Sequence, residues 1–216
     1  MTMGFIKRLQ SMFVKNTNAE ELRGNDTGGG AVKSTDQAEA PKPPSEYQFK
    51  HPPLKRGLNV LRSAALASSN SAKFGMVRKN KDGSPRAHQG VDLAIPNGFR
   101  CYAVDDATVF ETNNSDTGGY GKWVILKLFN SPDDCRYVFY AHLDVIHVHT
   151  GQKVKAGDVI GLTGHSGNAR GMTSIARGGH LHFEARKIAR PGKGLEGRTD
   201  PLRFFKVDKE HNKSLL

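Results

Sequence analysis

The chain changes character near Phe74, beyond which short apolar stretches alternate at regular intervals with Gly, Asn, Asp and Pro. The clearest of these stretches are rich in β-branched and aromatic residues and span residues 101–110, 123–129, 137–142 and 180–185. Apolar alternation over a few residues, bounded by turn formers, is typical of strands. Residues 118–121 and 131–134 have the compositions of turns. The sequence therefore predicts a mostly β fold, with a compact antiparallel β-sheet or sandwich.

Composition divides the rest of the chain. Its 216 residues suffice for one domain of about 150 residues and a tail. Residues 15–50 are rich in Asn, Asp, Gly, Glu and Pro and lack apolar periodicity, which predicts a flexible linker, whereas residues 5–14 have the spacing of a short amphipathic helix. Residues 54–67 form either one helix or an extended lead-in. The predicted boundaries are 1–50 for a flexible, partly helical N-terminal region, 51–72 for a lead-in segment, 73–207 for the main domain and 208–216 for a C-terminal tail.

The chain is basic, with 32 Lys and Arg against 21 Asp and Glu and a formal net charge of +11. Residues 1–50 carry seven basic and six acidic side chains, so the excess belongs to residues 51–216. Such an excess favours an anionic partner: nucleic acid, an acidic membrane surface or an anionic polymer such as a cell wall. The basic residues are scattered rather than grouped in runs, and no stacking-aromatic or helix–turn–helix motif is recognisable, so we expect no specific nucleic-acid partner. No apolar run approaches the roughly 18 residues of a membrane-spanning helix, so we expect no transmembrane segment.

Two cysteines are present, Cys101 and Cys135. This number excludes a disulfide-rich scaffold and a multi-cysteine zinc module. The two residues can pair only if their Cα atoms lie within about 7 Å, in an oxidising compartment. We expect two free, part-buried thiols instead.

His88 and Asp92 are the first candidates for chemistry. They lie four residues apart, with Gly90 between them, so a tight loop can bring both side chains to one point. An imidazole and a carboxylate are both zinc ligands. This spacing alone is a weak signal, because it often arises by chance.

A second group of candidates lies in the stretch His180-Leu-His182-Phe-Glu184. On a strand, His180, His182 and Glu184 point to one face, so two imidazoles can reach the same cavity. His142 ends another apolar stretch, where a partly buried histidine bonded to the backbone is an equally good interpretation. Taken together, the three segments supply two nitrogen ligands, one carboxylate and two further histidines. Three protein ligands with an open fourth position are typical of catalytic zinc.

The chain resembles the LytM/lysostaphin-type zinc endopeptidases, which cleave cross-links or stem peptides of bacterial peptidoglycan. The resemblance runs from about residue 74 to residue 205 and rests on motifs that occur in the family's order. They are HQGVD (88–92), AVDDATV (103–109), GKWVIL (121–126), YAHL (140–143), GQKVKAGDVIG (151–161), TGHSG (163–167), HLHFE (180–184) and DP (200–201). The resemblance implies that residues 73–207 form a zinc endopeptidase domain with an active-site groove.

The resemblance also implies the roles of the candidate residues. One Zn²⁺ is held by His88, Asp92 and His182, and His142 and His180 are catalytic residues that flank the bound water. Either of these two histidines can be the general base, and the other then stabilises the oxyanion or protonates the leaving amine.

Two further residues have alternative interpretations. Glu184 is either a carboxylate that orients a ligand histidine or an exposed strand residue. Tyr140 lies nominally on the face of His142, and it either lines the groove or packs in the core.

The expected function is hydrolysis of peptidoglycan peptides by a zinc endopeptidase. The cleaved bond is either a D-alanyl–diaminopimelyl cross-link or a glycine bridge. The N-terminal apolar stretch is too interrupted for a signal peptide, so we expect a protein that is made in the cytoplasm and acts in the periplasm or cell wall of a target cell. Delivery as a type VI secretion effector, with an immunity protein in the producer, fits this expectation. The alternatives are a phage or prophage lysin and a non-catalytic activator of wall amidases.

Overall fold

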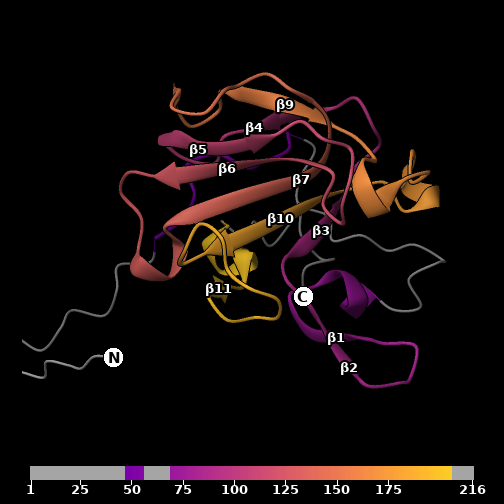
Figure 1. The fold of residues 1–216 in the computed structure, drawn as a ribbon. Coiled ribbons are helices and arrows are strands. Elements are labelled where there is room, and N and C mark those ends of the chain that lie inside the picture. The colour runs from indigo at the N-terminus through magenta and orange to yellow at the C-terminus, as the bar shows by residue number, and fades with distance from the viewer. Residues whose placement is uncertain (1–46, 56–68, 206–216) are drawn as a thin grey trace, which may run out of the picture. The chain divides into compact units, whose positions relative to one another are not determined.

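The structure is a computed structural model that describes residues 47–55 and 69–205 (Figure 1). The helix predicted at residues 5–14 and the C-terminal tail lie outside these residues. Every strand pairing in the described part is antiparallel, and strands outnumber helical turns. This confirms the predicted mostly β fold. Across 47–55 and 69–205, no helix is long and apolar enough to cross a membrane.

The regular elements of the described part are short strands and single turns of 3-10 helix. The strands are β1 (Gly75–Lys79), β2 (Pro85–His88), β3 (Val91–Ala94), β4 (Arg100–Tyr102), β5 (Ala107–Asn113), β6 (Lys122–Leu128), β7 (Tyr137–Ile146), β8 (Lys153–Val154), β9 (Val159–Thr163), β10 (His180–Arg186) and β11 (Arg198–Thr199). The 3-10 helices are η1 (Ser69–Ala72), η2 (Asp133–Cys135), η3 (Gly167–Ala169), η4 (Ile175–Arg177) and η5 (Pro201–Phe204).

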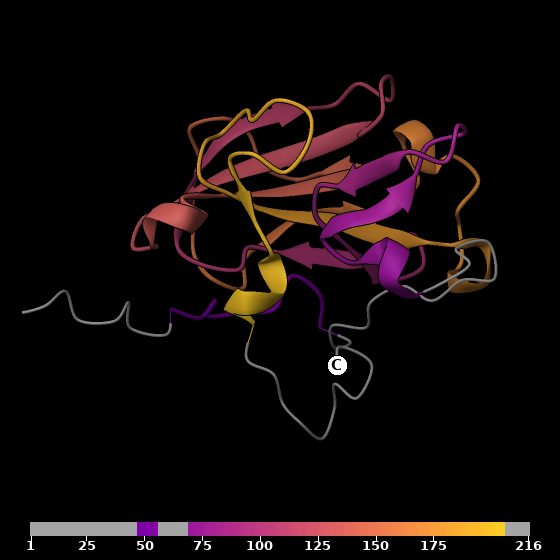
Figure 2. The same ribbon diagram turned by 90° about the horizontal axis from the view of Figure 1, so that it is seen from below.

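Nine strands form one sheet, with the order β11-β10-β7-β6-β5-β8; β3 also pairs with β10, and β9 pairs with β7 and β4 (Figure 1). Strands β1 and β2 form a separate hairpin, which Figure 2 shows from below in magenta. Strand β10 is central to the arrangement because β7 pairs along one of its edges, and β3 and β11 share the other. Residues from β3 and β7 are therefore held beside the same strand.

All seven residues of β10 are buried, although the strand alternates apolar and polar side chains. Leu181, Phe183 and Ala185 belong to the main hydrophobic core. Because strand side chains alternate between faces, the polar residues of β10 point to the opposite side of the sheet. They are His180, His182, Glu184 and Arg186. Burial of four polar side chains on one face requires a network of partners there.

The stretch at 101–110 forms two strands rather than one. Strands β4 and β5 are separated by a bend at Asp105, whose side chain accepts a hydrogen bond from the Asp106 N–H at 2.7 Å. Asp105 also accepts a hydrogen bond from the Tyr47 hydroxyl at 2.6 Å and pairs with Lys50. The acidic pair thus ends one strand and anchors the N-terminal segment of the described chain.

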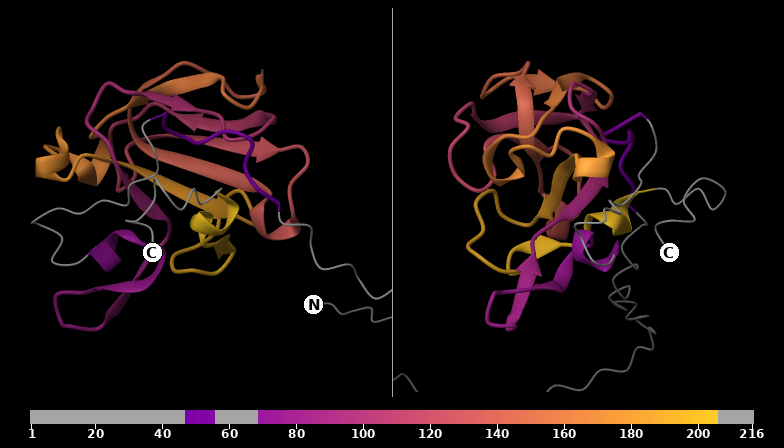
Figure 3. Two further views of the ribbon diagram at one scale, coloured as in Figure 1. Left: turned by 180° about the vertical axis from the view of Figure 1, so that it is seen from behind. Right: turned by 90° about the vertical axis from the view of Figure 1, so that its right-hand side faces the viewer.

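Residues 47–55 pack against the sheet, as Figure 3 shows from behind. Phe49 is 5% exposed, and its ring centroid lies 6.0 Å from that of Phe183 and 5.1 Å from that of Phe205. Its N–H donates to the Phe204 carbonyl at 2.8 Å. Residues 47–50 end the region expected to be a flexible tail, yet Phe49 is part of the core and the partly buried Tyr47 packs against it.

Replacing Phe49 with alanine is expected to lower the free energy of unfolding by about 3–5 kcal/mol, because a buried aromatic ring is lost and a cavity is left among other rings. Urea denaturation of the full chain measures this change. Phe129→Ala is the matched control, since Phe129 is 51% exposed, and a change within about 0.5 kcal/mol is expected for it. Equal losses in the two variants would contradict the packing described for Phe49.

The two cysteines are both free and both buried, Cys101 in β4 and Cys135 in η2. Burial raises the pKa of each thiol, which keeps it protonated and unreactive at neutral pH. The prediction of two free thiols is confirmed.

Candidate active site

Strand pairing places two of the candidate metal ligands side by side. In the β3–β10 register Asp92 lies opposite His182, and His88 ends β2 just before β3 begins. His88 Nε2 lies 3.1 Å from Asp92 Oδ1 and 3.2 Å from His182 Nδ1, and the last two atoms are 2.9 Å apart. Zinc bonds of 2.0–2.1 Å in a tetrahedron separate ligand atoms by about 3.3 Å. The three buried donors therefore fit a zinc ion.

The opposite ring nitrogens of the two histidines have partners that fix their orientation. His88 Nδ1 donates to the Lys73 carbonyl at 2.9 Å, which leaves Nε2 as the donor atom for a metal. His182 Nε2 lies 3.0 Å from Glu184 Oε1, which leaves Nδ1 for the metal. Burial alone would lower the pKa of His182, but Asp92 and Glu184 outweigh burial and raise that pKa to about 9.

Asp92 presents one carboxylate oxygen to the histidines and the other to a guanidinium. Arg78 of β1 donates from Nη2 to Asp92 Oδ2 at 2.5 Å, and its Nε donates to the Ser71 carbonyl at 2.8 Å. Burial would raise the pKa of Asp92, but the surrounding histidines hold it well below its usual range. The carboxylate is therefore ionised, with Oδ1 directed at the candidate metal site.

His142 and His180 lie next to these ligands. Their ring centroids are 5.1 Å apart, and the centroid of His142 is 5.9 Å from that of His182. His142 Nδ1 donates to the Ser166 carbonyl at 3.0 Å, and His180 Nδ1 donates to the Gly178 carbonyl at 2.7 Å. Because a carbonyl only accepts, Nδ1 of each ring carries a hydrogen, and Nε2 is the atom of each ring that is left for another partner. Burial, with His180 and His182 nearby, lowers the pKa of His142 to about 3, so its imidazole is neutral at pH 7.

The backbone of His142 has an unusual conformation, with a φ of 60°. Among the described residues other than glycine, it alone has a positive φ. This left-handed conformation costs a residue with a side chain about 1–2 kcal/mol. It interrupts the alternation of β7, so His142 points to the site side while Tyr140 packs in the core. Tyr140 donates its hydroxyl to the Tyr102 carbonyl at 3.0 Å, which settles its two interpretations in favour of the core.

The segment TGHSG holds His142 in this conformation. Ser166 accepts from His142 through its carbonyl, donates from Oγ to the Leu143 carbonyl at 2.8 Å, and accepts at Oγ from the Lys122 N–H at 2.9 Å. A Cβ on Gly121 would collide with the backbone of Ser166 and Gly167. The glycines of this motif and of GKWVIL thus permit the two loops to meet beside His142.

The structure brings together the five residues predicted for the centre, but most of the residues that bond them were not predicted. Glu184 is fully buried and bonds His182, as one of its two interpretations proposed. The supporting residues that were missed are Arg78, Gln89, Tyr120, Ser166, Arg186 and Arg198. They are far from their partners in sequence or have no distinctive local pattern, although Gln89, Tyr120 and Ser166 lie in or beside matched motifs.

Comparisons with known proteins point to one family. The family model of peptidase family M23 matches residues 86–196. The chain is 35% identical over 104 residues to the peptidoglycan DD-endopeptidase ShyA of Vibrio cholerae, a match that covers 48% of this chain and 21% of that protein. It is 35% identical over 143 residues to the murein hydrolase activator NlpD of Salmonella dublin, which covers 66% of this chain and 33% of that protein. A crystal structure of a zinc containing peptidase from Vibrio cholerae is similar with a TM-score of 0.50 and 27% identity, over 68% of this chain and 39% of that one.

The extent of these matches limits what they say about the whole protein. The chain spans 21% and 33% of the lengths of the two curated relatives. The family match nevertheless covers half of this chain, and it includes the segments of the three candidate metal ligands and both flanking histidines. The chain belongs to peptidase family M23.

Proposed function

We propose that this protein is a zinc-dependent endopeptidase that hydrolyses peptide cross-links or stem peptides of bacterial peptidoglycan. One observation supports the proposal: three buried side chains that could together hold a metal ion lie next to two histidines whose Nδ1 atoms are bonded to backbone carbonyls and whose Nε2 atoms are left for a reacting group. The peptidoglycan DD-endopeptidase among the relatives supports the choice of substrate.

The proposed chemistry assigns a role to each residue of the centre. His88, Asp92 and His182 would hold the zinc ion, which supplies Lewis acidity to a scissile carbonyl and to a water molecule. His142 and His180 each hold a proton on Nδ1 and present Nε2, so one can accept the proton of the water at Nε2. The other would assist the oxyanion or the leaving amine in its imidazolium form, which carries a second proton on Nε2. The carbonyls of Ser166 and Gly178 keep these rings oriented.

Incubation of the zinc-loaded full chain with purified peptidoglycan tests this proposal. We expect mass spectrometry to detect muropeptides cut at a peptide bond, and we expect a chelator to abolish their release and added zinc to restore it. Parallel digests of peptidoglycan with direct D-alanyl–diaminopimelyl cross-links and with glycine bridges identify the bond; the direct cross-link is the expected one. Loaded protein that releases no fragments from either polymer would contradict the proposal.

A second candidate function, activation of a wall amidase by contact, has its own support. The murein hydrolase activator NlpD is 35% identical over 143 residues. The group of His88, Asp92 and His182, which could hold a metal ion, favours the enzyme, because an activator that acts by contact needs no metal. Fragments released in the absence of any amidase would support the peptidase, whereas fragments released only when an amidase is added would support the activator.

Delivery to a target cell as a type VI secretion effector, with a cognate immunity protein, stays a prediction from the sequence, as does action in the periplasm or cell wall. Release by a phage or prophage is its alternative. The effector hypothesis requires the protein to appear in culture medium only when the secretion machine is intact. Equal amounts in the medium of a strain that lacks the machine would contradict it.

A further inference from the structure

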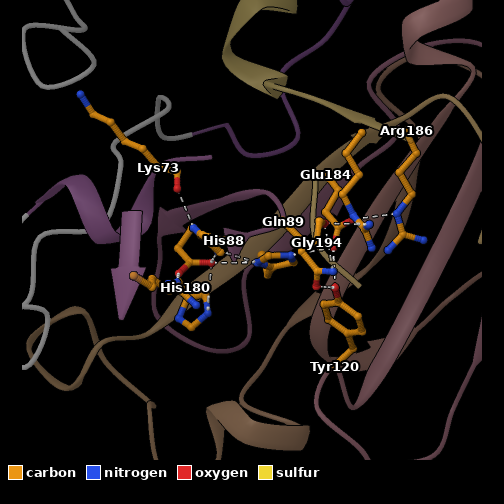
Figure 4. A network of polar contacts seen from close by, with 12 residues as sticks. Lys73, His88, Gln89, Tyr120, His180, Glu184, Arg186 and Gly194 are labelled. Atoms are coloured by element: carbon orange, nitrogen blue, oxygen red, sulfur yellow. Dashed lines mark hydrogen bonds and ion pairs between the residues drawn. The ribbon is translucent and has the colours of Figure 1, made fainter. Parts of the chain in front are cut away.

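Glu184 is a fully buried carboxylate whose two oxygens are both saturated with donors (Figure 4). Oε1 lies 3.0 Å from His182 Nε2 and accepts from the Tyr120 hydroxyl at 2.8 Å. Oε2 accepts from Arg186 Nε and from Arg198 Nε, each at 2.7 Å. A buried charge is tolerated only when it is paired and hydrogen-bonded, so two guanidinium groups keep Glu184 ionised. Only Oε1 is directed at the histidine.

The Tyr120 hydroxyl has one hydrogen, and this fixes the direction of the bonds around it. An ionised Glu184 can only accept, so Tyr120 donates to Glu184 and must accept from its other neighbour, Gln89. With Nε2 of Gln89 turned toward Tyr120 at 2.5 Å, Oε1 of Gln89 accepts from the Gly194 N–H and from Arg198 Nη2, each at 3.2 Å. One arrangement therefore satisfies every group in this chain of bonds.

This chain of bonds connects both histidine ligands. Gln89 follows the ligand His88 directly in sequence, and Glu184 holds the ligand His182. Between them, a Cβ on Gly90 would collide with the Phe183 carbonyl and would lie 2.8 Å from Cγ of Glu184. The backbone that carries the first ligand thus lies against the carboxylate that orients the second.

Arg198 bonds both Glu184 and the segment that connects β10 to β11. Its Nη1 donates to the Gly192 carbonyl at 2.8 Å and to the Gly194 carbonyl at 3.1 Å, while its Nε holds Glu184. One side chain therefore ties this connection to the carboxylate behind His182.

We propose that Tyr120 and Arg198 are positioning residues for the metal ligand His182, and that both act through Glu184. Neither side chain bonds a metal donor atom directly. Tyr120 fixes Oε1 of Glu184, Arg198 fixes Oε2, and the carboxylate then holds His182 with Nδ1 directed at the metal. This inference rests on the proposed zinc site.

Tyr120→Phe is the main test, because it removes one hydroxyl and keeps the ring. We expect the variant to bind zinc about 10-fold more weakly in competition with a chelator of known affinity, since outer partners of metal-binding histidines typically contribute 10- to 100-fold to affinity or activity. We also expect a shifted visible absorption band after cobalt substitution, and a lower kcat with an unchanged KM. Tyr137→Phe, in the neighbouring strand β7, is the matched control and should behave as the unmodified chain does.

Arg198→Met and Arg198→Lys form a second pair of variants. Arg198→Met should weaken zinc binding at least as much as Tyr120→Phe does, and Arg198→Lys should restore part of the affinity through its retained charge. If the unmodified chain binds zinc and Tyr120→Phe keeps both its affinity and its cobalt band, the inference is overturned while the zinc site stands. If the unmodified chain binds no zinc, the proposed function itself is overturned.

Discussion

Replacing His182 with alanine is expected to remove zinc from the protein and to lower kcat/KM by about 10³-fold or more. The side chain supplies one of three donor atoms that lie 2.9–3.2 Å apart, and two remaining ligands hold zinc poorly. The expected loss corresponds to the several kcal/mol of transition-state stabilisation that the proposed zinc ion would supply. Atomic absorption of the dialysed protein and release of peptidoglycan fragments measure the two effects.

His88→Ala is expected to give the same result, and it is a useful companion because it leaves the bond between His182 and Glu184 in place. His147→Ala is the matched control, since His147 is exposed and lies outside the centre. Full zinc content and full activity in either ligand variant would show that the ligand assignment is wrong.

Replacing His142 with alanine has a different expected outcome, because turnover is lost while zinc is retained. The Nε2 atom of His142 is a candidate proton acceptor, and a positioned acid or base typically contributes 10²- to 10⁴-fold to the rate. Its only described bonds are to backbone groups, Ser166 through the ring and Tyr120 through the N–H, so its removal leaves every metal donor in place. The kcat of the zinc-loaded variant is the quantity to measure.

The zinc content of the purified variants distinguishes a catalytic residue such as His142 from a metal ligand such as His182. A His142→Ala protein that has lost its zinc would place His142 among the ligands and would require a new assignment of the centre. Residue 142 has a left-handed backbone conformation, and an alanine there could adopt a different one and alter the local fold. Circular dichroism should therefore check that the variant is folded. A folded, zinc-bound variant with unchanged kcat would remove His142 from the catalytic residues.

The fold class was predictable because its signal is local. Alternating apolar residues between turn formers specify strands wherever they occur, and β10 follows this rule with Leu181 and Phe183 in the core and His182 on the other face. The interruption at His142 was not predictable in the same way. Strict alternation puts Tyr140 and His142 on one face, and the positive φ that separates them is maintained by a loop more than twenty residues away in sequence.

The candidate metal donors were predictable for a different reason. HQGVD and HLHFE contain the proposed ligands themselves, and the chemical types of these residues are sufficient to suggest zinc. Their supports depend on pairings that sequence spacing does not encode: Arg78 reaches Asp92 from the hairpin, and Arg198 reaches Glu184 from β11. An arginine in either place has no local pattern that distinguishes it from the other basic residues of this chain.

The packing of Phe49 shows that the part of this chain needed for its folded core is longer than the part that matches the family. The matched region, residues 86–196, excludes Phe49, its partner Phe205 and also Arg78, which holds Asp92. A fragment cut to the recognisable region would expose an aromatic cavity and free a buried carboxylate from its guanidinium. A shortened version of this chain should therefore take its borders from the buried aromatic contacts, beginning before Tyr47, and not from the extent of sequence similarity.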